Sequence, residues 1–250
     1  MLIWVQAGLW GLLAGGALVV GALIAWFIKV PRSVVATVMA FGAGVLISAL
    51  AFDLMAEAES RGGLRPTLVG FLGGALVYVA ANVALARRGA RHRKRSEDQQ
   101  PSERKQAGSG TAIAIGALLD GVPESIVLGL TLLEGQGVGI AVLAAVFISN
   151  LPEAIGSTTG LATAGWRRSR ILWMWVAIAL VSGAASAAGY GLFQNASPGV
   201  LAFVLTFAAG AILTMLANTM MPEAFDEGGK LVGIATTLGF AVAFAIHLLD

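Results

Sequence analysis

The stretch 120–125, with the sequence DGVPES, introduces two carboxylates into a long apolar run. Asp120 and Glu124 are four residues apart, so a helix would place them on one face. Pro123 lies between them and cannot donate to the carbonyl four residues earlier, which leaves that oxygen free and tends to kink the helix. Because a charge inside an apolar helix needs a partner, this stretch decides how the rest of the chain is interpreted.

A second stretch, 149–154 with the sequence SNLPEA, repeats the pattern. Ser149 and Glu153 again share a helical face and again flank a proline, with Asn150 beside them. The two stretches predict two helices that offer carboxylates, small polar groups and carbonyl oxygens at similar depth. Such oxygens are ligands for a cation.

Composition places the chain in a membrane. Of 250 residues, 57% are hydrophobic and 12% are charged, and the mean hydropathy is +0.83. Soluble domains carry about 25% charged residues, so an all-α polytopic membrane protein is expected. The absence of cysteine excludes disulfides and thiolate metal sites. The first apolar run lacks a basic leader and is too long for a signal-peptide core, so we expect it to be a retained span.

Eight apolar runs meet the length of about 20 residues that a spanning helix needs. They are approximately 3–28, 34–57, 66–86, 110–133, 137–164, 171–193, 198–221 and 230–249. We expect one transmembrane domain over 1–250, interrupted by a charged loop at about 87–108. That loop is interpreted as a disordered cytoplasmic connector, with no nucleic-acid partner, because it lacks aromatic interleaving.

Basic residues set the expected orientation. With both termini outside, every Lys and Arg except Arg61 and Arg65 falls on the cytoplasmic side of eight spans. Short loops and a compact chain suggest a bacterial inner membrane, and glycine-rich faces permit a homodimer.

The carboxylates follow a repeat. Four pieces share a glutamate followed by a small residue, with a polar residue four positions before the glutamate: 53–58 (DLMAEA), 120–125, 149–154 and 219–224 (TMMPEA). Under this topology the first and last of their helices run in opposite directions, and so do the middle two. This pattern predicts an inverted repeat, as found in transporters.

Depth along the helices suggests a path for a cation. At 1.5 Å per residue, the acids of 120–125 and 149–154 fall near the middle of a core about 30 Å thick. Asp53 and Glu57 would mark an outer mouth, and Glu223 an inner exit. The alternative is that the outer and inner acids are interfacial charges and the central acids are protonated structural hydrogen-bond partners. His92 and His247 are interpreted as residues without a ligand role.

The sequence predicts eight spans, a charged loop after the third, outside termini, and PE motifs in the fourth and fifth helices. This combination resembles the ZIP family of metal-ion transporters. The resemblance implies eight helices in a 3+2+3 inverted arrangement that move zinc, iron, manganese or related divalent cations into the cytoplasm. The family's fourth-helix motif, His-Asn-x-Pro-Glu-Gly, corresponds here to 120–125, so Asp120 replaces its histidine. Asp53 stands where the second helix often carries histidine, and the sixth helix has no carboxylate, which puts a second bridging metal in doubt.

An all-oxygen site of Asp120, Glu124, Asn150 and Glu153 favours harder ions, so binding of manganese or ferrous iron is favoured relative to binding of zinc. Three carboxylates around a divalent ion leave a net negative charge, and proton coupling is therefore expected. The metal is expected as the transported substrate, without an organic cofactor.

Two further hypotheses remain open from the sequence. One is a proton-coupled carrier of a small organic solute, and the other is a non-transporting membrane protein that keeps the carboxylates as structural hydrogen bonds. An enzyme is not expected, because the chain has no Ser–His, His-Glu-x-x-His or cysteine arrangement.

Overall fold

A computed structural model describes residues 2–87, 109–134 and 137–249, and this part of the chain is helical throughout, without strands. Nearly all of the predicted charged loop at 87–108 lies outside the described residues. The α-helices are α1 (Ile3–Phe27), α2 (Arg32–Ala49), α3 (Ala56–Gly62), α4 (Leu64–Leu85), α5 (Ser109–Thr131), α6 (Ile140–Thr163), α7 (Arg168–Phe193), α8 (Pro198–Met215), α9 (Met221–Gly228) and α10 (Val232–His247). Most helix limits lie within three residues of the predicted apolar runs, whereas α2 and α8 end earlier than predicted, at Ala49 and Met215.

Short segments of other helix types continue several of these helices. Two are π-helical, η1 (Leu50–Met55) between α2 and α3 and η5 (Leu216–Met220) between α8 and α9. Two are 3₁₀ turns, η4 (Leu132–Glu134) and η6 (Gly229–Leu231). Isolated π-helical turns often occur at functional sites, and here both fall in the helices that carry the first and last carboxylate motifs.

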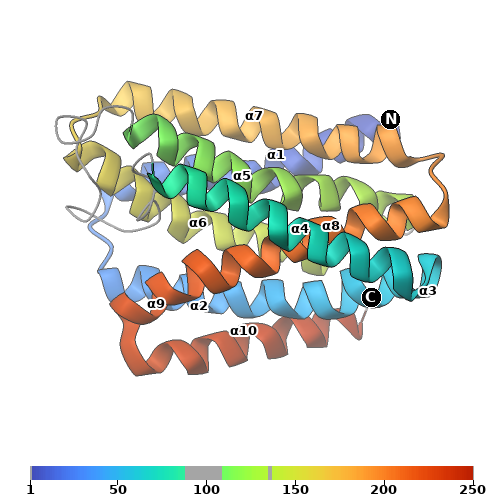
Figure 1. Cartoon of the computed structure of the whole chain (residues 1–250). Helices are drawn as coiled ribbons and strands as arrows, with labels where there is room; N and C mark the ends of the chain where they lie inside the picture. Colours follow the sequence, from blue (N-terminus) through green and yellow to red (C-terminus); the bar gives the residue numbers. More distant parts are fainter. Residues whose placement is uncertain (1, 88–108, 135–136, 250) are drawn as a thin grey trace.

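Within the described residues, seven helical stretches are long and apolar enough to cross a membrane. The last of them, Pro198–His247, contains α8, α9 and α10. In Figure 1, α8 and α9 run toward one end of the bundle and α10 returns beside α2. Both chain termini lie toward the same end of the bundle (Figure 1).

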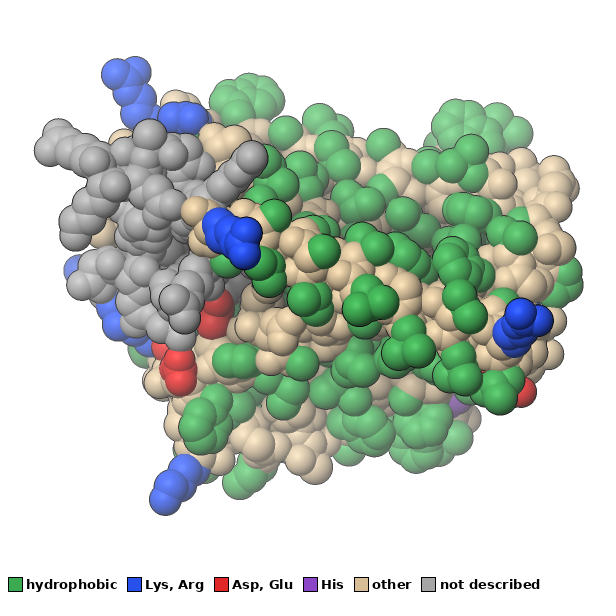
Figure 2. Space-filling view, viewed as in Figure 1, with side chains coloured by type: hydrophobic (Ala, Val, Ile, Leu, Met, Phe, Trp, Pro, Cys, Tyr) green, Lys and Arg blue, Asp and Glu red, His purple; other side chains and the backbone are tan. Residues whose placement is uncertain are grey.

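The surface between the two ends of the bundle suits lipid. Many large apolar side chains are exposed on it, including Leu72, Leu76, Trp173, Leu180 and Leu192. Figure 2 shows that charged side chains gather at the two ends of this face, with an apolar band between them. Long apolar helices with exposed apolar side chains identify an integral membrane protein.

The helices repeat at a constant spacing. α2 and α8 begin at Arg32 and Pro198, and η1 and η5 begin at Leu50 and Leu216. The next reversal falls at a glycine with positive φ in both cases, Gly63 (φ 80°) and Gly229 (φ 64°), and the members of each pair are 166 residues apart. Figure 1 places α3 and α9 at opposite ends of the bundle, so the two copies run in opposite directions.

The two copies pack across each other through glycines. A Cβ at Gly44 of α2 would lie 1.9 Å from the carbonyl oxygen of Thr236 in α10. A Cβ at Gly210 of α8, the repeat counterpart of Gly44, would lie 1.9 Å from the carbonyl oxygen of Phe71 in α4. Only glycine permits such backbone contact. The helices α1, α5, α6 and α7 pack mainly with one another, so the two motif helices α5 and α6 are both placed against α1.

Candidate cation site

The first motif lies in the middle of α5. Asp120 and Glu124 are 3% and 2% exposed, and Pro123 lies inside the helix, which continues through it. The hydroxyl of Ser125 donates to the carbonyl oxygen of Gly121 at 2.7 Å, which is a local helix contact. Two carboxylates are therefore buried side by side on one helix, as the sequence predicts.

Tyr78 of α4 also belongs to this site. Its hydroxyl donates a hydrogen bond to Oδ1 of Asp120 at 2.6 Å, and its side chain is 1% exposed. Sequence reasoning missed this residue because it stands in an apolar run with no motif around it. The available signal was that it is one of only two tyrosines in the chain and the only one in its helix, since a buried tyrosine hydroxyl needs a partner.

The second motif lies in the middle of α6, and Ser149, Asn150 and Glu153 are all buried. Asn150 donates from Nδ2 to the carbonyl oxygen of Ala14 in α1 at 3.1 Å. This bond uses the amide nitrogen and leaves the amide oxygen as the atom able to bind a cation. Ser149 donates to the carbonyl oxygen of Val146 at 3.0 Å, so its hydroxyl oxygen keeps acceptor capacity.

At the end of the bundle that holds the termini, a cavity of about 320 Å³ has a polar wall. Asp53, Glu57 and His247 line it together with Phe52, Thr131 and residues 137–142. Nδ1 of His247 lies 2.5 Å from Oδ1 of Asp53. The sequence assigned no role to His247, and the structure brings it to the predicted outer carboxylate. Its position near the end of an apolar run, outside every motif, gave no signal of this contact.

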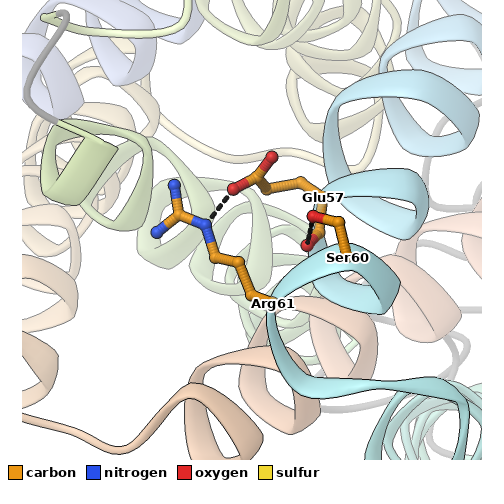
Figure 3. Close-up of polar contacts among 3 residues, drawn as sticks. All are labelled: Glu57, Ser60 and Arg61. Carbon is orange, nitrogen blue, oxygen red and sulfur yellow. Dashed lines mark hydrogen bonds and ion pairs between the residues drawn. The ribbon is translucent and has the colours of Figure 1, made fainter.

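Glu57 lies on the cavity wall but also forms an ion pair with Arg61, one turn further along α3 (Figure 3). Both side chains are about one-third exposed, at 30% and 32%. The Ser60 hydroxyl donates to the backbone carbonyl of Glu57 at 2.9 Å (Figure 3). This is the environment of an interfacial charge, which was the alternative interpretation of Glu57.

The inner carboxylate, Glu223, lies in α9 and is 6% exposed. Thr219, four residues before it, is also buried and donates to the carbonyl oxygen of Met215 at 2.8 Å. Because α3 and α9 occupy opposite ends of the bundle (Figure 1), Glu57 and Glu223 stand toward opposite ends with the α5 and α6 motifs between them.

In the part of the chain that the structure describes, no group of three or more His, Asp or Glu side chains is arranged to hold a metal ion. The acids of α5 and α6 therefore do not form a closed cluster. The predicted ligand set also contains two neutral oxygens, those of Asn150 and Ser149. A group defined only by His, Asp and Glu side chains leaves these oxygens out.

No protein-family model matches the chain. A curated protein of Arabidopsis thaliana named "Putative zinc transporter" is similar to it, with 24% identity over 233 residues. The matched region covers 92% of this chain and 36% of the relative, so the chain spans about a third of that protein's length. This similarity agrees with the resemblance to zinc and iron transporters that the motifs carry.

Proposed function

We propose that the chain transports divalent metal cations across a membrane. The observation that carries the proposal is the burial of Asp120, Glu124 and Glu153 in the middle of two apolar helices. Ionisable groups at such depth are costly and usually mark an ion or proton pathway. The similarity to a protein named as a zinc transporter supports the same function and favours a transporter over an enzyme.

In this proposal the central ligands are oxygens of Asp120, Glu124, Asn150 and Glu153, with Ser149 beside them. Asp53 and Glu57 collect ions at the outer mouth, and Glu223 assists release at the inner end. The central acids are drawn together by the ion itself, since a divalent charge offsets the repulsion that keeps carboxylates apart without it. Carboxylate and amide oxygens favour manganese or ferrous iron over zinc.

The proposal includes eight membrane crossings in a 3+2+3 inverted arrangement, with α10 as the last crossing. Both termini at one end require an even number of crossings, and the spacing of 166 residues between equivalent elements supports an inverted repeat. We place the termini outside, with uptake toward the cytoplasm, in a bacterial inner membrane. A homodimer belongs to the same proposal.

Metal binding to the purified chain tests the site. Manganese, ferrous iron, zinc, cobalt, cadmium and magnesium are titrated against wild type and Asp120→Ala/Glu124→Ala. Preferential binding of one transition metal that disappears in the double variant supports the proposal. Glu59→Gln is the control, because Glu59 is an exposed acid of α3 away from the central helices. Equal metal binding by wild type and the double variant would contradict the assignment of Asp120 and Glu124 as metal ligands.

A further inference from the structure

The Tyr78 hydroxyl reaches Asp120 from a different helix. The two side chains come from α4 and α5, are 1% and 3% exposed, and share a hydrogen bond of 2.6 Å. We propose that Tyr78 is a positioning residue that holds the Asp120 carboxylate in the orientation in which it binds the transported cation. This inference rests on the function proposed above and adds a residue to its site.

The contact is a short hydrogen bond from the Tyr78 hydroxyl to a carboxyl oxygen of Asp120. A hydroxyl that donates to an oxygen lies about 2.5–3.0 Å from it, whether the acceptor is neutral or charged. The Tyr78–Asp120 distance falls within that range. A phenol that donates to Asp120 at this distance is a direct partner of the proposed metal ligand. It also restricts rotation of the carboxylate about its Cβ–Cγ bond.

Tyr78 is itself held in place by the backbone of its helix. Gly74 lies one turn before it on α4, and a Cβ at Gly74 would lie 1.8 Å from the carbonyl oxygen of Phe207 in α8. Gly70, one turn earlier, makes a similar contact with Phe203. Two backbone contacts therefore fix the position of α4 along its axis, and its rotation about that axis, next to the tyrosine. A rigid donor of this kind is what orients a metal ligand, and such outer partners typically contribute about 10- to 100-fold in affinity.

A purely structural role is the alternative, in which the bond only ties α4 to α5. The two roles separate in Tyr78→Phe, which keeps the ring and removes the hydroxyl. We expect the Mn²⁺ and Zn²⁺ affinities of the purified full chain to fall about 10- to 100-fold. The matched control is Tyr190→Phe, which removes the only other tyrosine hydroxyl, on α7, and should bind as wild type does.

A second measurement uses the Asp120→Ala background. Tyr78→Phe should then cause no further loss of metal affinity, because the carboxylate that it positions is gone. Metal-free thermal unfolding of each variant is recorded alongside, since a purely structural role would lower the unfolding temperature of Tyr78→Phe and leave its Mn²⁺ and Zn²⁺ affinities at the wild-type values.

Three results would overturn the inference. One is wild-type affinity in Tyr78→Phe while Asp120→Ala binds more weakly than wild type, which leaves the proposed function intact. Another is an equal loss in Tyr190→Phe, which would show a general effect of removing a hydroxyl. The third is absence of metal binding by wild type itself, which would overturn the proposed function as well.

Discussion

Nδ1 of His247 and Oδ1 of Asp53 lie 2.5 Å apart, although 194 positions separate the two residues in the sequence. The contact joins the π-helical segment η1 to the last residue of α10. The ring of Phe52, next to Asp53, lies with its centroid 5.7 Å from that of the imidazole. The end of α10 thereby fixes a carboxylate on the wall of the cavity at the proposed outer mouth.

Replacing His247 with Ala should weaken ion capture without slowing the later steps. Partly exposed pairs of this kind contribute about 0.2–1 kcal/mol, which corresponds to an increase of up to about fivefold in the half-saturating metal concentration. The maximal uptake rate should stay unchanged, because the central site is intact. Uptake measured over a range of metal concentrations checks this, with Glu59→Gln as the control. A lower maximal rate at unchanged half-saturation would contradict the role of an outer capture site.

Gly44 should resist substitution because two helix backbones meet there. In Gly44→Ala the new Cβ would lie 1.9 Å from the carbonyl oxygen of Thr236, so α2 and α10 must move apart. Overpacking of this kind costs about 1–3 kcal/mol. Gly16→Ala is the matched control, because nothing lies within 4 Å of a Cβ there and helical alanine is favoured over glycine by about 0.5–1 kcal/mol. Thermal unfolding in detergent should rank Gly16→Ala above wild type and Gly44→Ala below it. Equal unfolding temperatures for the two variants would show that α2 and α10 are not in backbone contact.

Asn150 should prove to have two separable roles. Asn150→Ala removes both the proposed ligand oxygen and the donor to Ala14, whereas Asn150→Asp keeps an oxygen, removes the donor and adds a carboxylate. Losing the hydrogen bond between α6 and α1 costs about 0.5–1.5 kcal/mol, so both variants should unfold at lower temperature than wild type. Metal binding should survive in Asn150→Asp and weaken in Asn150→Ala. If Asn150→Ala binds metal as tightly as wild type, the residue is only a link between α6 and α1.

Much of the fold follows from apolar length and basic residues. The limits of α1, α4 and α7 agree with the expected runs to within three residues, because charged residues such as Lys29, Arg65 and Arg167 lie at or next to the ends of these helices. The π-helical segments could not be predicted, since no residue type marks them. The spacing of 166 residues between Gly63 and Gly229 could be predicted from the sequence, because the motifs 53–58 and 219–224 are separated by the same number of residues.

Part of the candidate site could also be predicted from the sequence, because it interrupts the apolar runs. Asp120 and Glu124 stand out because a carboxylate in an apolar helix is rare, and their spacing requires a shared face. Tyr78 and His247 could not be found that way. Each reaches a carboxylate from a distant helix, and only the packing of α4 against α8 and of α10 against α2 determines those contacts.

Uptake into vesicles tests the central claim most directly. Wild type and Glu124→Gln/Glu153→Gln are reconstituted into liposomes and supplied with manganese, ferrous iron or zinc, and Glu59→Gln serves as the control. Glutamine keeps the shape of each side chain and removes its charge. The account predicts that wild type and the control accumulate at least one of these metals and that the double variant is reduced to the level of empty liposomes. Wild-type uptake by the double variant would contradict a path through these two carboxylates.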